Sequence, residues 1–143
     1  MNQAIILEAR SVSYYTPSGT VLIDNVDLRI SEGESVAIAG PNGAGKSTLL
    51  RVLAGLLYPS RGDVLLFGCP LADLPPHERA QRIAFVDQRE QPDKRLVTEE
   101  YVALGRIPHQ RKASKLGHDQ AVNKALEAVG LIALRSELLA TLS

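Results

Sequence analysis

This chain of 143 residues has one cysteine, no net charge and no long apolar run. Its one cysteine, Cys69, has no second cysteine to pair with, which excludes an internal disulfide and predicts a reduced, cytoplasmic location. Residues 1–10 show no signal-peptide pattern, and no apolar run approaches the ~18 residues that span a bilayer. We therefore expect any association with a membrane to need a partner.

Neither sign of charge is in surplus, because 16 Lys and Arg residues balance 16 Asp and Glu residues. This balance argues against a nucleic-acid partner, which would be attracted by bulk positive charge. With 45% apolar and 22% charged residues, the composition is typical of a globular chain, and the length is that of one ordinary domain. We find no internal repeat and no low-complexity tract.

The first 88 residues alternate between strand-like and helix-like patterns. Helices are expected at residues 46–57 and 75–82, and strands at residues 4–15, 21–30, 36–39, 64–67 and 83–86. The segments 36–39 and 83–86 are short and almost wholly apolar, which predicts strands buried on both faces of a sheet.

The pattern changes at residue 89, where a polar loop precedes two expected helices at residues 98–104 and 119–129. Asp119 is the expected N-cap of the second helix, and Gly130 is its expected end. The chain is thus predicted to have an α/β fold in two parts, residues 1–88 and a mostly helical part at 89–143.

One motif carries chemistry. The phosphate-binding pattern G-x-x-x-x-G-K-[ST] is matched by Gly40-Pro41-Asn42-Gly43-Ala44-Gly45-Lys46-Ser47, between a strand-like segment and an apolar helix. Glycines let the main chain approach a triphosphate closely, and the helix that follows directs its free N–H groups at the phosphates. A glycine-rich turn with an incidental lysine is the alternative, but the full match in its expected context disfavours it.

Three side chains of this motif have predicted roles. Lys46 places a positive charge on the β- and γ-phosphates, and the Ser47 hydroxyl suits Mg²⁺, which prefers oxygen ligands. Thr48 can add a hydroxyl near the α-phosphate. Because GTPases, kinases and motor ATPases share this loop, it does not by itself identify the function.

The longer string from Gly40 to Leu50 resembles the nucleotide-binding subunits of ATP-binding cassette (ABC) transporters. Phe85-Val86-Asp87-Gln88 resembles the Q-loop of that family, with Asp87 where many members have proline. The resemblance implies the ABC type of phosphate-loop core, with an N-terminal antiparallel β subdomain and the start of a helical subdomain. It also implies ATP as the nucleotide, and Mg²⁺ held by Ser47 and Gln88.

In the same family pattern, Gln88 contacts the attacking water and Lys46 acts on the phosphates, so both are implied as catalytic. Without the loop upstream, a lone glutamine after a strand would be read as a surface residue. The family also stacks adenine on an aromatic residue, for which Tyr14 and Tyr15 are candidates, although the pattern can also point to Thr16. Packing within a strand is the alternative for both tyrosines.

The segment Tyr101-Val102-Ala103-Leu104-Gly105-Arg106-Ile107-Pro108-His109 resembles the ATPases that serve importers of ferric siderophores, haem and cobalamin. It is also a helix that glycine and proline end, and the two interpretations are compatible. The resemblance implies an integral membrane permease bound through the helical subdomain, a second copy of the ATPase, and a periplasmic binding protein that acts indirectly. The implied location is cytoplasmic, peripheral on the inner face of the cell membrane.

Residues 106–118 carry four Lys or Arg residues and no acidic residue. Such a stretch is commonly a solvated loop, and the alternative is a position near the permease or lipid headgroups. The three histidines, His77, His109 and His118, lack the spacing of a zinc site. Cys69 is interpreted as a small turn or core residue.

Members of the family continue after a segment like the last five residues into Gly-Gly-Gln or Gly-Gly-Glu, and Leu142-Ser143 falls where this signature begins. We therefore expect an incomplete domain, an N-terminal fragment without the acidic strand end and the switch histidine. Whether the chain hydrolyses ATP is left open. A soluble ABC ATPase that is not linked to transport and a catalytically inactive nucleotide-binding remnant are the alternatives.

Overall fold

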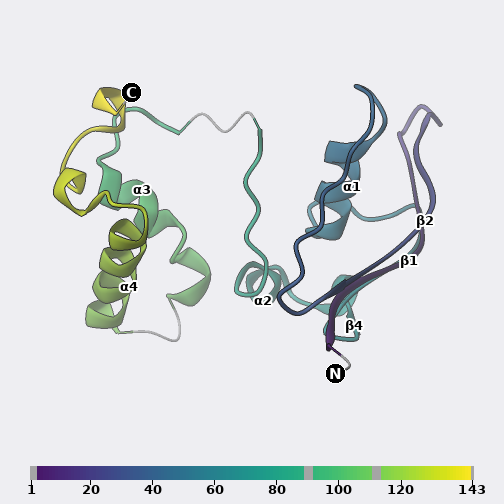
Figure 1. Ribbon diagram of the computed structural model, residues 1–143, viewed down its shortest axis with the longest axis horizontal. Coiled ribbons are helices and arrows are strands. Elements are labelled where there is room, and N and C mark those ends of the chain that lie inside the picture. The colour runs from purple at the N-terminus through teal and green to yellow at the C-terminus, as the bar shows by residue number, and fades with distance from the viewer. Residues whose placement is uncertain (1–2, 89–91, 111–113, 143) are drawn as a thin grey trace. The chain divides into compact units, whose positions relative to one another are not determined.

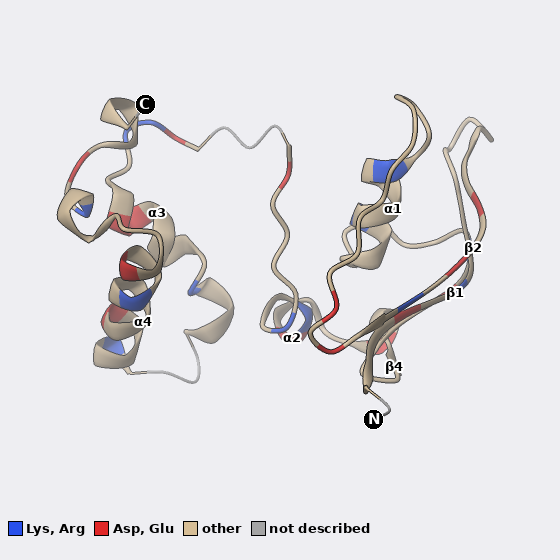
Figure 2. Cartoon of the chain, in the orientation of Figure 1, with Lys and Arg blue, Asp and Glu red and all other residues tan. Residues whose placement is uncertain are grey.

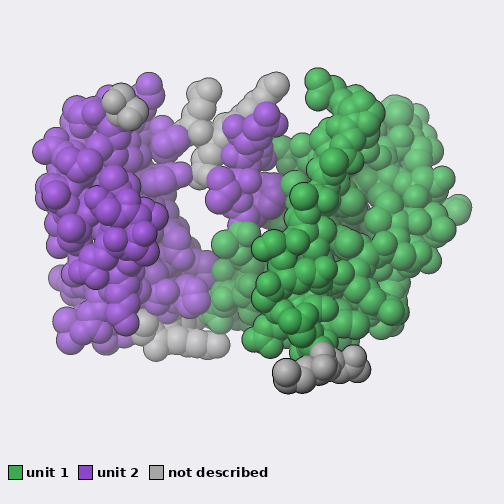
Figure 3. All heavy atoms as spheres, in the orientation of Figure 1, with its two compact units in different colours: residues 1–84 green, residues 85–143 purple. Residues whose placement is uncertain are grey.

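The computed structural model describes residues 3–88, 92–110 and 114–142, which form two compact units (Figure 1). The units are Met1–Ala84 and Phe85–Ser143, and Figure 3 colours them separately. The division expected from the sequence, after residue 88, lies a few residues further along the chain. Each unit is described below by itself.

An antiparallel sheet forms the first unit's framework, with the strand order β2-β1-β3-β4. Its strands are β1 (Ile5–Tyr15), β2 (Val21–Ser31), β3 (Arg61–Leu66) and β4 (Cys69–Pro70). The predicted antiparallel β subdomain is therefore confirmed. Cys69 is exposed in β4, directly after the turn at Phe67 and Gly68, so of its two interpretations, a small turn residue or a core residue, the core one was wrong.

Helix α1 (Lys46–Leu53) supplies the helical side of the first unit's core. Val52 and Leu53 are buried, whereas Leu50 and Leu56 are exposed. Only part of the apolar sequence predicted as a helix at residues 46–57 therefore packs into the core. The core consists of buried side chains from the sheet, α1 and the turn after β4: Ala9, Val12, Ile23, Val52, Leu53, Val64, Leu66 and Leu71.

Helix α1 ends four residues before its predicted end at residue 57, because Gly55 stops it. Gly55 has φ +70°, a left-handed conformation that side chains disfavour. The N–H of Leu56 donates to the Arg51 carbonyl at 2.9 Å, and the N–H of Gly55 donates to the Val52 carbonyl at 3.0 Å. This pair of hydrogen bonds is the Schellman motif, which satisfies the last carbonyls of a helix.

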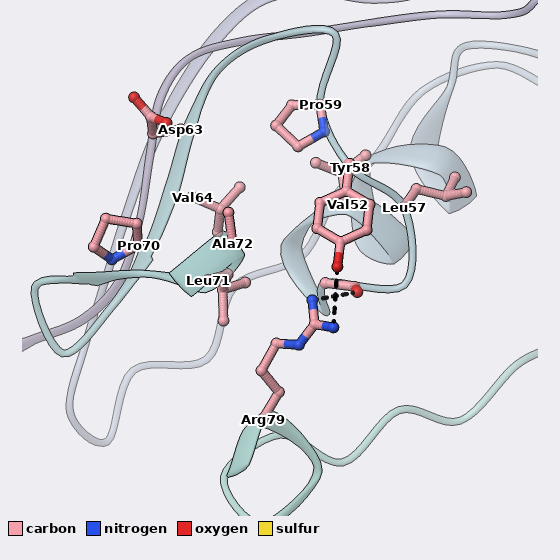
Figure 4. A pocket seen from close by; sticks show the side chains of 11 residues that line it. Val52, Leu57, Tyr58, Pro59, Asp63, Val64, Pro70, Leu71, Ala72 and Arg79 are labelled. Carbon is pink, nitrogen blue, oxygen red and sulfur yellow. Dashed lines mark hydrogen bonds between the residues drawn. The ribbon is translucent and has the colours of Figure 1, made fainter. Parts of the chain in front are cut away.

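Arg79, on helix α2 (Pro76–Ala80), holds the C-terminal end of α1 (Figure 4). Its Nη1 donates to the Gly55 carbonyl at 3.0 Å, and its Nη2 donates to the Tyr58 hydroxyl at 3.3 Å. The guanidinium also lies over the Tyr58 ring, 5.5 Å from the ring centroid. The adjoining cavity has a volume of about 30 Å³, which is room for about one water molecule.

Two strand predictions were wrong. Residues 36–39 and 83–86 form no strand, Val36 is 42% exposed and Val86 is 82% exposed. A strand exists only through hydrogen bonds to a neighbour, and in the described part of the chain neither segment has a neighbouring strand. Their apolar composition indicated burial, but these segments do not pair with the sheet of the first unit.

Helices dominate the second unit: α3 (Thr98–Leu104), the short 3-10 helix η2 (Ile107–His109) and α4 (Lys115–Ala128). Val122 and Leu126 of α4 are buried where α4 packs against α3. The side chain and N–H of Thr98 both donate to the Glu137 carbonyl, at 3.0 and 2.9 Å. The predicted helix at residues 98–104 is therefore confirmed.

Helix α4 begins earlier than predicted, so Asp119 is an interior residue and not its N-cap. Ser114 is the N-cap, and its Oγ accepts a hydrogen bond from the N–H of Gly117 at 3.2 Å. A serine oxygen satisfies one of the free donors of a first turn as well as an aspartate does, so both residues were plausible caps. The end at Gly130 is as predicted.

Charged residues of both signs lie along strands β1 and β2 (Figure 2). The largely buried Glu8 carboxylate accepts hydrogen bonds from Arg10 at 2.7 Å and from Arg29, across the strand pair, at 2.8 Å. The hydrogen bond from Arg10, followed by that from Arg29, lowers the pKa of Glu8 below its ordinary value of 4.5. This carboxylate therefore ties β1 to β2.

Acid should weaken this strand pair. Because folding lowers the pKa of Glu8, its contribution to stability is present above the unfolded pKa, near 4.5, and is lost as the pH falls through the folded value. We expect the protection of the β1 and β2 amides against hydrogen exchange, measured relative to the intrinsic exchange rate at each pH, to fall over that range. Glu8→Gln should flatten the acid dependence, and an unchanged profile in that variant would contradict the assignment.

Candidate phosphate-binding loop

The loop at residues 40–45 leads directly into α1. It is exposed over most of its length, and Gly45 is the residue immediately before the helix. The N–H of Ala44 donates to the Pro41 carbonyl at 3.3 Å, which closes a turn within the loop. This turn has an exposed backbone, and it consists of Gly40, Pro41, Asn42, Gly43 and Ala44.

Only glycine fits at position 45, because the backbone there lies against strand β2. A Cβ placed on Gly45 would lie 2.2 Å from the carbonyl oxygen of Leu22, and the backbone has φ +82°. Both the missing side chain and the left-handed conformation therefore require glycine. The loop is held against the backbone of the sheet at this point.

The first turn of α1 presents unoccupied donors. The first helical hydrogen bond runs from the N–H of Leu49 to the Gly45 carbonyl, at 2.8 Å. Within the described residues no hydrogen bond occupies the N–H groups of Lys46, Ser47 or Thr48, and no side chain caps the helix. With no acidic residue in this turn, the donors and the positive end of the helix dipole suit an anion.

The Lys46 side chain reaches back to the start of the loop. Its Nζ donates to the Gly40 carbonyl at 2.7 Å and to the Pro41 carbonyl at 2.6 Å. The ammonium is thus held over the turn by two neutral acceptors. Phosphate oxygens would replace carbonyls with charged acceptors, which make stronger hydrogen bonds.

The residues present suit Mg²⁺ held together with phosphates. Ser47 is exposed in the first turn of α1, and Thr48 beside it is half-buried. Among the residues that the structure describes, no cluster of His, Cys, Asp and Glu could hold a metal by itself. Mg²⁺ commonly takes one or two protein oxygens, with substrate phosphates and water completing its shell. A single hydroxyl beside free N–H donors fits that pattern.

A cavity of about 180 Å³ lies beside the loop, between α1 and β2. Its lining includes Ala44, Gly45, Lys46 and Asp24, together with apolar side chains of β2. This volume is below the 300–1,000 Å³ usual for ligand pockets, so we do not assign it to a nucleotide. The exposed N–H groups at the start of α1 are the better phosphate contacts.

The remaining predicted site residues belong to other segments: Gln88 to the second unit, and Tyr14 and Tyr15 to strand β1. Gln88 is exposed near the start of the second unit, so the site described here consists of the loop and α1. Tyr14 packs against the first unit's core, which supports the strand-packing interpretation for that ring. Tyr15 is half-exposed, and the Arg61 guanidinium lies over its ring, 5.8 Å from the centroid.

Two groups that contact α1 or the loop were not predicted from the sequence: the Leu22 carbonyl behind Gly45 and the Arg79 side chain at the far end of α1. A backbone carbonyl carries no sequence signal. An arginine that lies 24 residues after the glycine it contacts is equally undistinguished in the sequence. Only the fold brings either group to α1.

Comparisons with known proteins agree with these motifs. A family model described as ABC transporter matches residues 23–143. A hemin import ATP-binding protein, HmuV, of Rhodopseudomonas palustris (strain ATCC BAA-98 / CGA009) is 46% identical over 137 residues, which cover 96% of this chain and 49% of the relative. HmuV of Myxococcus xanthus is 39% identical over 137 residues, covering 96% and 51%. This chain spans about half the length of the curated relatives it matches.

Solved structures show the same fold. A dimeric ATP-binding cassette in a post-hydrolysis state, bound to ADP and Pi, superposes with a TM-score of 0.82 and 28% identity, covering 96% of this chain and 63% of that one. The ATP-binding subunit of another ABC transporter gives a TM-score of 0.79 and 27% identity, covering 96% and 56%. In the described part of the chain, no helix has the length and hydropathy needed to cross a bilayer.

Gly45 and Gly43 form a matched pair for testing how the loop is held. Both have φ +82°, but a Cβ on Gly43 meets no atom within 4 Å. Gly43→Ala should lower the free energy of unfolding by about 1–2 kcal/mol, through the left-handed backbone alone. Gly45→Ala should lose a further ~1–3 kcal/mol, because the Leu22 carbonyl must move. Chemical denaturation measures both, and equal losses would contradict the contact with β2.

Proposed function

The chain belongs to the ABC transporter family, and from that premise we propose that it binds ATP as part of an importer ATPase for a metal chelate, with haem as the favoured chelate. The loop geometry carries this proposal. Free N–H groups, a positive helix end and one lysine converge at the start of α1, with no acidic residue in that turn. This arrangement suits a polyphosphate.

The loop residues and α1 have separate tasks in this proposal. Residues 40–45 wrap the phosphates with backbone, and Lys46 exchanges the Gly40 and Pro41 carbonyls for phosphate oxygens. Ser47 supplies a hydroxyl ligand to Mg²⁺, which would neutralise phosphate charge. Gln88 remains a proposed ligand and water-positioning residue, on the family pattern alone.

The relatives' names support the choice of chelate. The R. palustris and M. xanthus relatives, each aligned over 96% of this chain, are both named for hemin import. Ferric siderophores and cobalamin are the alternatives within the same group of importers. The working assembly we propose has two ATPase copies on membrane permease subunits at the cytoplasmic face, with a periplasmic binding protein acting indirectly.

Nucleotide binding provides the first test. Lys46→Ala should weaken binding of Mg·ATP by the 143-residue chain about 10- to 100-fold, because hydrogen bonds to ionised groups contribute about 1.5–3 kcal/mol. Titration calorimetry measures the affinity. Lys124→Ala, an exposed lysine on α4, is the matched control and should bind as the unaltered chain does. Equal affinities for all three would exclude the loop as the ATP site.

Growth experiments test the chelate. A strain lacking this protein should fail to grow with haem as its sole iron source but should grow on a ferrous salt. The gene for the unaltered protein should restore growth on haem, and a Lys46→Ala gene should not. Loss of growth on a ferric siderophore alone would transfer the proposal to that chelate, whereas unimpaired uptake of haem, siderophore and cobalamin would refute the importer.

A further inference from the structure

Strand β2 contains an extra residue relative to β1. Val12 pairs with Val26 and Tyr14 pairs with Ile23, so a step of two residues along β1 is matched by a step of three along β2. Such a β-bulge reverses the alternation of side chains, which otherwise has a period of two. Val26 and Leu28, at even positions, pack against the first unit's core, whereas nearer the loop it is Ile23, at an odd position, that is buried.

A buried serine on β1 holds this bulge. Asn25 has φ +47°, a left-handed conformation that few residues other than glycine adopt and that asparagine tolerates best. Its N–H donates to the Ser13 Oγ at 2.9 Å. Ser13 is 3% exposed, so water does not compete for this hydrogen bond. Because β2 lies at the edge of the described sheet, β1 is the one strand beside it that can provide such an acceptor.

The bulge adjoins the part of β2 that contacts the phosphate-binding loop. A Cβ on Gly45 would lie 2.2 Å from the Leu22 carbonyl oxygen and 3.7 Å from the Cγ1 of Ile23. Leu22 and Ile23 are the third and second residues before Asn25. Without the extra residue both groups would point the opposite way, because carbonyls and side chains each alternate along a strand. The side of β2 that Gly45 meets therefore depends on the bulge.

We propose that Ser13 is a positioning residue for the phosphate-binding loop. By accepting the hydrogen bond of Asn25, it keeps the extra residue in β2 and directs the Leu22 carbonyl at Gly45. That contact sets where α1 begins. Ser13 acts through the strand and touches no nucleotide itself. This inference rests on the proposed function of the loop in binding ATP.

Strand β1 has a bulge of its own, which provides a matched control. Its Ser11 has φ +48°, and the N–H of Ser11 donates to the Asp27 Oδ1 at 2.8 Å. Strand β3 encloses this bulge from the other side, since a Cβ on Gly62 would lie 2.3 Å from the Arg10 carbonyl oxygen. The Asp27 hydrogen bond thus resembles that of Ser13 but holds a bulge that a third strand also supports, away from Gly45.

Titration of the 143-residue chain with Mg·ATP tests the proposal. Ser13→Ala should weaken binding about 3- to 10-fold, which is the net contribution of one hydrogen bond. Asp27→Ala should bind as the unaltered chain does. Adding Asn25→Gly to Ser13→Ala should recover most of the affinity, because glycine adopts a positive φ without a partner. Circular dichroism verifies that each variant folds.

The backbone amide resonances of the loop give a second measurement, which needs no nucleotide. Ser13→Ala should shift the Gly45 and Lys46 resonances, and Asp27→Ala should leave them in place. If the unaltered chain does not bind Mg·ATP, the proposed function fails, and these resonances still decide whether Ser13 positions the loop. Should the alanine variant not fold, Ser13→Cys replaces the oxygen with a weaker acceptor of similar size and should cause the same changes, reduced in magnitude.

Two results would overturn the proposal. One is a Ser13 variant that folds and leaves the Gly45 resonance unmoved. The other is an Asp27→Ala variant that shifts this resonance, or weakens Mg·ATP binding, as much as Ser13→Ala does. In the second case the two hydrogen bonds would stabilise the sheet alike, and neither would position the loop.

Discussion

The contact between Gly45 and the Leu22 carbonyl is the constraint on which the loop's geometry depends. Because a Cβ would lie 2.2 Å from that oxygen, the loop can approach β2 only through a glycine. This approach sets where α1 begins, and therefore where its free N–H groups stand relative to the sheet. The proposed phosphate site is thus positioned by the contact of the loop backbone with the β2 backbone, and side chains complete it.

The affinity of such a site for phosphate depends on the difference between Lys46 bound to carbonyls and Lys46 bound to phosphate. The ammonium already has two carbonyl acceptors, at 2.7 and 2.6 Å. A phosphate must displace them, so the net gain is the excess of a charged acceptor over neutral ones and not the full strength of a new hydrogen bond.

Local sequence signals predicted local structure well, and long-range pairing poorly. The loop motif, the helix at Thr98–Leu104 and the stop at Gly130 depend on residues within one or two turns, and the structure has each of them. Residues 36–39 and 83–86 failed as strands because their apolar character describes burial, whereas a strand requires a hydrogen-bonded neighbour elsewhere in the chain. The role proposed for Gln88 is equally hard to predict from local sequence, since it depends on a phosphate site outside its own segment.

The backbone groups at the two ends of α1 are satisfied to different degrees, and this difference underlies the role proposed for the helix. At its C-terminal end, the turn at Gly55 lets backbone N–H groups donate hydrogen bonds to the last carbonyls of the helix. The Arg79 guanidinium adds positive charge there, which complements the negative end of the helix dipole. At its N-terminal end, no side chain among the described residues caps the helix, and its first turn contains no acidic residue. The helix is thus satisfied where it meets the protein and left unsatisfied where a phosphate can bind.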